Sequence, residues 1–479
     1  MERNPDILLK ANQALENDLN VIADMSAANA HGHLIWCATY YALRSDDLEG
    51  LILEYYNKES DSDYSVRYPI VTRHYFFAPL KIFKAIGKKL FSKKIASKSP
   101  SCWFSVSNPE FRHRYRNVFE YLAPSINKAF FTNDHIRDIN CGNAGTSLNF
   151  ADYFKVADIF RAYGTARSVK KSIVKLKADS IAANWIKKMP VTHVYNMALR
   201  ELWIERALKT QQPKAVFFAT ANTYSPARLM SRICKRNNIP FVVVACRSMF
   251  SPLRSEERVS AADLKEINDS RIADMWLMWD KFSINTLQGV KVPSDKIFLS
   301  QPDPVKVFHA RICNTPYLLL LTHERDLNTV MIDEWLKICG DVKILAIRTH
   351  PLCKLTESQM EKLSGFEIDD ISSVPMNTIN FDNTVAVSIN STAAVEACSY
   401  GCGIFWMPYL NERSVIFAPI MNILGYVAGN SAEGNTFLQN HLDDARRVEF
   451  VNACTESYNE NFKGTDNAAL LFKKLNLAN

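Results

Sequence analysis

The stretch of sequence that decides the fold is residues 385–408, which read VAVSINSTAAVEACSYGCGIFWMP. A short apolar run ends in a polar Asn-Ser-Thr turn at 390–392, a helix-like segment follows it and stops at Gly401, and a second apolar run then begins. This order predicts a strand, a turn, a helix and another strand, the unit from which parallel sheets are built. The turn falls where the amides of a helix N-terminus point outward, an arrangement that favours an anion.

A matching unit lies upstream of this stretch. The apolar run 342–348 predicts a strand, and it ends in Arg348-Thr349-His350-Pro351 before a predicted helix at 357–363. We expect these two polar strand ends to be neighbours. Together they predict a site for a phosphorylated ligand in the C-terminal half of the protein.

Strands and helices alternate through both halves of the chain. The predicted strands are 215–219, 241–245, 275–279, 317–321, 342–348, 366–368, 385–389 and 403–407. Residues 110–210 contain few Gly or Pro and are predicted to be helical. The pattern predicts an α/β protein with two Rossmann-like domains in series, joined by a turn-rich connection that ends near Pro316.

Bulk composition narrows the class of protein. A chain of 479 residues exceeds one ordinary core, which predicts two domains. The net charge of +7 is mild and no nucleic-acid motif occurs, so we expect no nucleic-acid partner. The eleven cysteines are irregularly spaced, which argues against a zinc site or a disulfide framework. No Gly-x-Gly-x-x-Gly, P-loop or Gly-x-Ser-x-Gly occurs, which disfavours dehydrogenases, kinases and α/β-hydrolases.

Membrane contact rests on one segment. Residues 81–98 place apolar side chains at helical spacing among seven lysines, and such a helix suits either an anionic membrane surface or simple solvation. No apolar run reaches the roughly 18 residues of a membrane span, and the first residues lack the apolar core of a signal peptide. We therefore expect a cytoplasmic protein, soluble or attached peripherally to the inner membrane.

Three stretches resemble the GT-B glycosyltransferases of bacterial surface polysaccharide (capsule and lipopolysaccharide) biosynthesis, especially the sialyl- and Kdo-transferase types. One is Arg348-Thr349-His350-Pro351 at a strand end. About forty residues later comes Ser-Thr-x-x-x-Glu-Ala-x-x-x-Gly, here residues 391–401. The third is the run 273–302. The resemblance covers roughly residues 213–430.

This resemblance implies two Rossmann-like domains that face a cleft. Residues 1–305 would form an N-terminal acceptor-side domain with helical insertions, and residues 306–479 a C-terminal donor-binding domain. The implied enzyme is a metal-independent glycosyltransferase without a cofactor, which takes a nucleotide-activated sugar, with a CMP-activated acidic sugar slightly preferred. Its partners would be that donor and a surface-glycan or lipid-linked acceptor.

The resemblance also assigns roles to residues. His350 would hydrogen-bond the donor phosphate, the hydroxyls of the 391–392 turn would grip it, and Glu396 would bind a ribose hydroxyl. The full expected donor-binding set is Arg348, His350, Pro351, Asn390, Ser391, Thr392 and Glu396. Plain helix capping by Ser391 and Thr392 is compatible with this role. His350 and Glu396 would otherwise be ordinary surface side chains.

The catalytic base should lie across the cleft in the first domain. Asp47 and Glu49, in Asp-Asp-Leu-Glu-Gly, are candidates alongside His350 for the catalytic set, and Asp134 with His135 is an alternative of equal standing. Three other functions remain open. They are a CDP-glycerol-type glycerophosphotransferase, an isomerase like the UDP-sugar 2-epimerases, and a binding protein without turnover.

Overall fold

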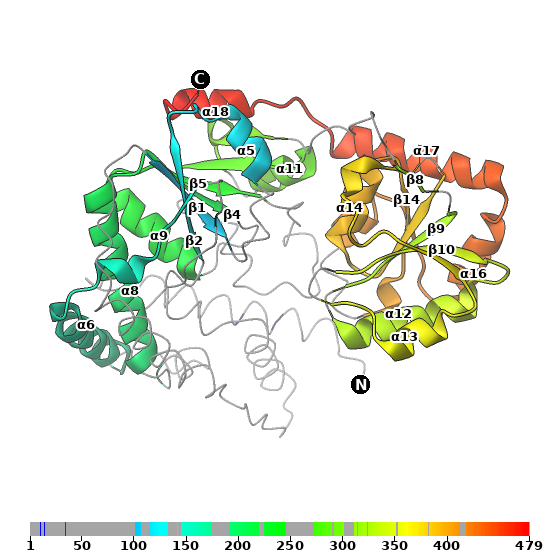
Figure 1. The fold of residues 1–479 in the computed structure, drawn as a ribbon, viewed down its shortest axis with the longest axis horizontal. Coiled ribbons are helices and arrows are strands. Elements are labelled where there is room, and N and C mark those ends of the chain that lie inside the picture. Colours follow the sequence, from blue (N-terminus) through cyan, green and yellow to red (C-terminus); the bar gives the residue numbers. More distant parts are fainter. Residues whose placement is uncertain are drawn as a thin grey trace.

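The computed structural model describes residues 101–106, 115–132, 145–174, 191–219, 225–245, 273–289, 292–300, 311–313, 315–322, 324–350, 353–381, 383–411 and 418–478, with Lys10, Ala14, Leu34, Cys141 and Lys187. Figure 1 shows that these residues form two α/β units, one on each side of the view. The expected pair of Rossmann-like domains is therefore confirmed. The expected boundary between residues 305 and 306 lies outside the described residues and stays a prediction.

In the part of the chain that the structure describes, seven parallel strands form the first sheet, in the order β3-β2-β1-β4-β5-β6-β7. They are β1 (Ser101–Val106), β2 (Asn127–Thr132), β3 (Thr146–Ser147), β4 (Ala215–Ala219), β5 (Phe241–Val244), β6 (Met275–Met278) and β7 (Ile297–Leu299). Its central strands are buried apolar runs, such as FVVV in β5, because helices cover both faces.

The helices of the first unit divide between the two faces of the sheet. They are α5 (Arg116–Tyr121), α6 (Ala157–Val174), α8 (Val191–Gln211), α9 (Ser225–Arg236) and α11 (Lys281–Gly289), with the short 3-10 helix η3 (Phe150–Tyr153). Helices α8 and α9 share a core with one face, and α5 shares a core with the other. Helix α6 forms a further layer on α8 and lies at the edge of the molecule (Figure 1).

Six parallel strands among the described residues form the second sheet, in the order β11-β10-β9-β13-β14-β15. They are β9 (Tyr317–Leu320), β10 (Ile344–Arg348), β11 (Glu367–Asp370), β13 (Val385–Ser388), β14 (Gly403–Trp406) and β15 (Tyr426–Val427). From β9 the chain winds outward in one direction to β11 and then in the other to β15. This doubly wound order places a topological switch point between β9 and β13.

Helices cover both faces of the second sheet as well. They are α12 (Arg325–Ile338), α13 (Glu357–Lys362), α14 (Thr392–Ser399), α15 (Ala418–Met421), α16 (Ser431–Asn440) and α17 (Asp444–Asn461). Helices α12 and α16 share a core with one face, and α14 and α17 with the other. A small separate ladder pairs β8 (Arg311–Ile312) with β12 (Ile379–Asn380).

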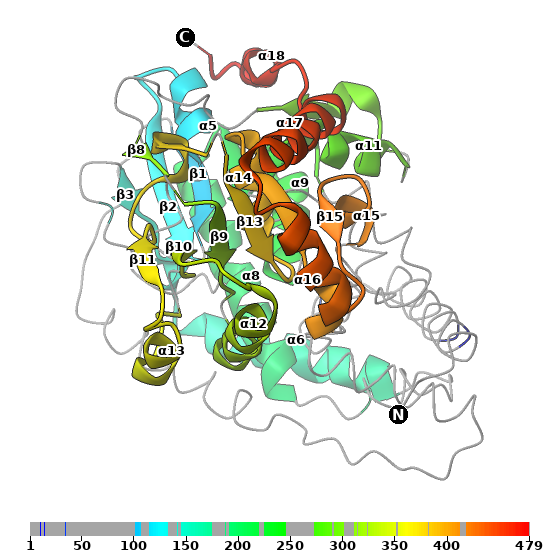
Figure 2. The same ribbon diagram turned by 90° about the vertical axis from the view of Figure 1, so that its right-hand side faces the viewer.

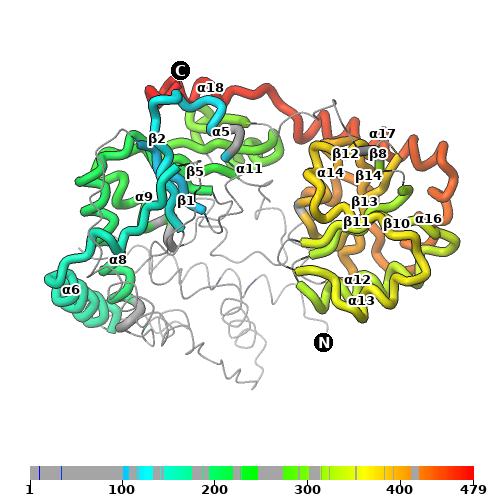
Figure 3. Tube along the Cα trace, in the orientation of Figure 1, coloured from blue at the N-terminus to red at the C-terminus, as the bar shows by residue number. Residues whose placement is uncertain are grey.

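The end of the chain returns to the first unit. Helix α18 (Ala468–Lys474) packs into the core on the same face of the first sheet as α5, where Phe472 stacks on Phe217 with ring centroids 5.8 Å apart. Just after α17, where the chain crosses back to the first unit, the Lys281 N–H donates to the Phe462 carbonyl oxygen at 2.8 Å. The rings of Phe282 and Phe462 stack there with centroids 5.4 Å apart. Figures 2 and 3 show this path from α17 to α18.

Two expectations about the fold are wrong. Residues 110–210 are not wholly helical, because they contain β2 and β3, and β1 just before them has no counterpart among the expected elements. The strands β10 and β13 are not neighbours either, since β9 pairs with both of them. Among the described residues, no helix has the length and apolar character that crossing a bilayer requires. The basic segment 81–98 lies outside the described residues.

Candidate functional site

The candidate site lies at the carboxyl edge of the second sheet, around its switch point. The pairing of the strands shows where the loops of the site begin. Leu319 of β9 pairs with Ile347 of β10 on one side and with Val387 of β13 on the other. His350 and Asn390 each follow three residues after those partners, so the two loops leave the sheet at the same height. Strands lie about 4.8 Å apart, so one intervening strand separates the loops by roughly 10 Å.

The loop after β10 contains His350. Its carbonyl oxygen accepts a hydrogen bond from the Cys353 N–H at 2.8 Å, which closes a tight turn, and its side chain is half-buried. The preceding residue, Thr349, is held through its N–H and hydroxyl by Ser372 Oγ, at 2.9 and 3.0 Å. The backbone that presents the imidazole is thus fixed on both sides. Pro351 lies outside the described residues.

Arg348 joins this loop to its surroundings. Its Nη1 donates to the carbonyl oxygens of Ile371 and Val374, at 2.9 and 2.6 Å, and so holds the loop after β11. Burial lowers the pKa of the Arg348 guanidinium, and the carboxylate of Glu396 opposes that shift. Because Glu396 lies on α14, this electrostatic contact connects the β10 side of the site with the β13 side. Its expected part in donor binding stays a prediction.

The turn after β13 is built by a helix cap. Ser391 is the N-cap of α14, and its Oγ accepts a hydrogen bond from the Ala393 N–H at 3.2 Å. The buried Ser388 Oγ accepts from the Ser391 N–H at 3.1 Å and so fixes the turn from below. Helix α14 ends with Gly401 at φ +91°, a conformation that glycine adopts without strain. Asn390 is half-buried beside the cap.

A buried amide that sequence reasoning missed ties two loops of the site together. Asn328, on α12, accepts a hydrogen bond from the Thr322 N–H at 2.7 Å, and its Nδ2 donates to the Thr322 carbonyl oxygen at 3.0 Å. The same Nδ2 lies 3.6 Å from Cys353 Sγ. Asn328 thereby fixes the loop after β9 against the loop that contains His350. The signal in the sequence is a polar residue on an apolar helix face, one turn before Met331 and Ile332.

A second missed residue on α12 supports the loop after β14. The carboxylate of buried Glu334 accepts hydrogen bonds from the hydroxyls of Tyr409, at 2.9 Å, and Ser431, and pairs with Lys337 at 3.3 Å. Burial alone would raise the pKa of Glu334, but these hydrogen bonds outweigh burial and lower it. Helix α12 therefore positions three of the loops at this edge of the sheet.

Other expected site residues are not described by the structure. Asp47, Glu49, Asp134 and His135 lie outside the described residues, and the side chain of Thr392 is likewise outside them. Among the residues that the structure does describe, no group of His, Cys, Asp and Glu side chains is arranged to hold a metal ion. The catalytic base and the metal independence of the reaction stay predictions.

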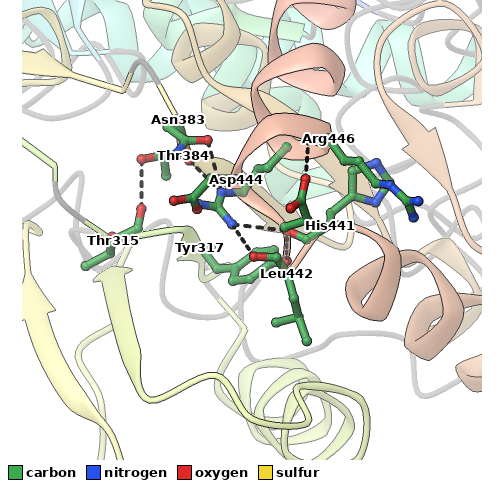
Figure 4. A network of polar contacts seen from close by, with 10 residues as sticks. Thr315, Tyr317, Asn383, Thr384, His441, Leu442, Asp444 and Arg446 are labelled. Carbon is green, nitrogen blue, oxygen red and sulfur yellow. Dashed lines mark hydrogen bonds and ion pairs between the residues drawn. The ribbon is translucent and has the colours of Figure 1, made fainter.

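A cavity of about 620 Å³ lies at the opposite, amino edge of the same sheet. Arg447 lines it, but its guanidinium is used within the protein: Nε donates to the Asn383 carbonyl oxygen at 3.1 Å, and Nη1 to the carbonyls of His441 and Leu442 at 3.1 and 3.2 Å (Figure 4). Its Nη2 also pairs with Asp444. Burial raises the pKa of Tyr317, at the cavity wall, to about 12. We interpret the Arg447 cluster as a structural clamp, separate from the candidate site.

The chemistry available at the carboxyl edge is anion binding. The N-terminus of α14 points to this edge: the Ala393 and Ala394 N–H groups donate to the Oγ and the carbonyl oxygen of Ser391, and the helix dipole favours negative charge just beyond this cap. A half-buried imidazole follows β10 at the same height. The switch point is where ligands of doubly wound sheets bind. These features together suit a phosphate group carried by a larger molecule.

Comparison with known proteins gives a likeness of fold only. No protein-family model matches this chain, and no curated protein matches it. Among solved structures, CalG4, the calicheamicin glycosyltransferase, shares 11% identity over 76% of this chain and 95% of its own, with a TM-score of 0.46. UDP-GlcNAc 2-epimerase from Neisseria meningitidis shares 11% identity over 79% and 99%, with a TM-score of 0.44. The wall teichoic acid polymerase TagF shares 10% identity over 86% and 99%, with a TM-score of 0.42. At these scores the likeness adds no argument about activity.

Proposed function

We propose that this protein is a metal-independent glycosyltransferase that uses a nucleotide-activated sugar and transfers the sugar to a surface-glycan or lipid-linked acceptor. The observation that carries the proposal is the switch point of the second sheet, flanked on one side by the His350 loop and on the other by the capped N-terminus of α14. Two of the three stretches that resemble the proposed family fall on these two loops.

The proposed chemistry is stabilisation of a leaving phosphate. When the bond from the sugar to the donor phosphate breaks, negative charge grows on the phosphate oxygens, and preoriented hydrogen-bond donors lower the barrier. His350 would donate one hydrogen bond, the Ser391 hydroxyl would donate another, and the dipole of α14 would add attraction for the phosphate. Glu396 would accept a hydrogen bond from a ribose hydroxyl while its charge is balanced by Arg348. Asp47 or Glu49 would remove the acceptor proton from the opposite domain.

A nucleotide screen by thermal shift tests the site. A ligand that binds only the folded state raises the melting temperature, by an amount that grows with its concentration over Kd. We expect CMP to raise it most, consistent with a CMP-activated acidic sugar as donor. A larger response to CDP-glycerol would favour the glycerophosphotransferase, and a response to UDP-GlcNAc with release of free epimer would favour the isomerase.

His350→Ala tests the mechanism. Loss of one hydrogen bond to a developing oxyanion costs on the order of a hundredfold in turnover. The matched control is Lys343→Ala, because Lys343 is exposed and lies just before β10, at the opposite end of that strand. The proposal is wrong if His350→Ala keeps both full transferase activity and unchanged nucleotide affinity.

A further inference from the structure

We propose that the outer face of α6 docks the protein on an anionic lipid surface. This inference rests on the first unit alone and does not depend on the proposed enzymatic activity. It also differs from the expectation for segment 81–98, because it concerns a helix that the structure describes in full.

The inner face of α6 is fixed against the rest of the unit. Small and aliphatic side chains pack it onto α8; they are Ala162, Ala166, Val169 and Ile173, all fully buried. Asp158 is also fully buried, and its two carboxylate oxygens accept hydrogen bonds from Arg206 of α8 at 2.8 and 2.7 Å. These contacts set the rotation of the helix, so its opposite face is held toward the surroundings.

That opposite face is apolar where a solvated helix would be polar. Val156 precedes the first turn and is 61% exposed, Phe160 is 73% exposed, Tyr163 57% and Val174 59%. With about 100° of rotation per residue, these four positions fall within some 60° of one another around the helix, and roughly 125° around it from the buried line. Two aromatic side chains at the crest of a surface helix are unusual for a face that contacts only water.

Cations lie among these apolar side chains. Arg167 and Lys171 fall within about 60° of the same line, between Tyr163 and Val174, and both are exposed. Arg161 and Lys155 are also exposed, but they lie more than about 90° around the helix from that line. The one acid of α6, Asp158, is buried and paired with Arg206. The exposed face of the helix therefore has positive charge and apolar groups but no carboxylate.

Exposed aromatic side chains next to cations suit an anionic lipid surface better than the other kinds of partner. Aromatic side chains insert at the level of lipid headgroups, and each Lys or Arg near an anionic leaflet adds attraction. A second copy of the same face fits poorly, because a two-fold contact would place the cations of one helix against those of the other with no acid between them. A protein partner would need an acidic groove to match these cations.

Vesicle flotation tests the proposal on the full-length protein. We expect wild type to float with vesicles of phosphatidylcholine and phosphatidylglycerol, and much less with phosphatidylcholine alone. Phe160→Ser combined with Tyr163→Ser should lower partitioning by about tenfold or more. Arg167→Gln combined with Lys171→Gln should lower it on the order of tenfold at low salt, and less at high salt.

The matched control is Leu470→Ser. Leu470 is 58% exposed on α18, which lies at the opposite end of the first unit from α6 (Figures 1 and 2). Its replacement should leave partitioning unchanged, and circular dichroism should show all variants folded. Two results overturn the proposal: wild type that binds neither kind of vesicle, as a protein-docking face would give, or binding that both α6 double variants retain in full.

Discussion

Asn328 and Thr322 close a hydrogen-bonded ring, in which the Thr322 N–H donates to Asn328 Oδ1 at 2.7 Å and Asn328 Nδ2 donates to the Thr322 carbonyl oxygen at 3.0 Å. These two hydrogen bonds fix the end of β9 at the switch point. Because the same Nδ2 contacts Cys353 Sγ at 3.6 Å, one side chain on α12 sets the spacing of two loops of the candidate site.

Asn328→Ala should therefore weaken both stability and ligand binding. It leaves a buried N–H and a buried carbonyl without partners, which costs about 2–4 kcal/mol in the free energy of unfolding. Nucleotide affinity should also fall, since the His350 loop loses a support. Urea unfolding and nucleotide titration measure the two effects. Val330→Ala, on the exposed side of the same helix, is the control and should change stability by less than about 0.5 kcal/mol.

Ser391 has two roles that a pair of substitutions can separate. Asp and Asn are both good N-caps, so Ser391→Asp and Ser391→Asn should each keep the stability of α14. Asp adds a negative charge where the donor phosphate would lie, and we expect it to reduce nucleotide affinity by more than tenfold. Asn should reduce it only a few-fold. Equal affinities of the two variants in isothermal titration would mean that no phosphate sits at this cap.

Glu334→Gln should reveal a pH-dependent contribution to stability. The folded protein lowers the pKa of Glu334, so its charged form stabilises the fold above the ordinary carboxyl pKa of about 4.3. That contribution is lost as pH falls through the lower pKa of the folded state. We expect the variant to be less stable by roughly 1–2 kcal/mol near neutral pH, with the difference shrinking in acid. Glu361→Gln, at an exposed position, should show no such trend when unfolding is followed against pH.

Arg447→Ala should destabilise the second unit without changing ligand binding at the candidate site. It removes the donors to the carbonyls of Asn383, His441 and Leu442 together with the packing of a buried side chain, which we expect to cost about 2–3 kcal/mol. Its neighbour Arg446 is exposed, so Arg446→Ala should be nearly silent. Below the unfolding transition, nucleotide affinity of Arg447→Ala should match wild type; a large loss would place the ligand in the cavity at the amino edge.

Local pattern sufficed for most elements of both sheets. Strand β4 falls where its apolar run predicts, at Ala215–Ala219, and β13 and β14 differ from expectation by one residue each. The failures are β1, β2 and β3, in a region expected to be helical or left unassigned. Short apolar runs such as AFF in β2 carry no periodicity that separates strand from buried helix, and only pairing with neighbouring strands decides the outcome.

The candidate site divides in the same way. Its position at strand ends, and the cap formed by Ser391, follow from the residue order in one stretch of chain, because caps and turns depend on near neighbours. Three relations follow only from the folded structure: β9 lies between the two loops, Asn328 joins the loop after β9 to the His350 loop, and Glu396 acts on Arg348. These relations link residues far apart in the sequence, and they form when burial of the apolar strands and helix faces brings separate segments together.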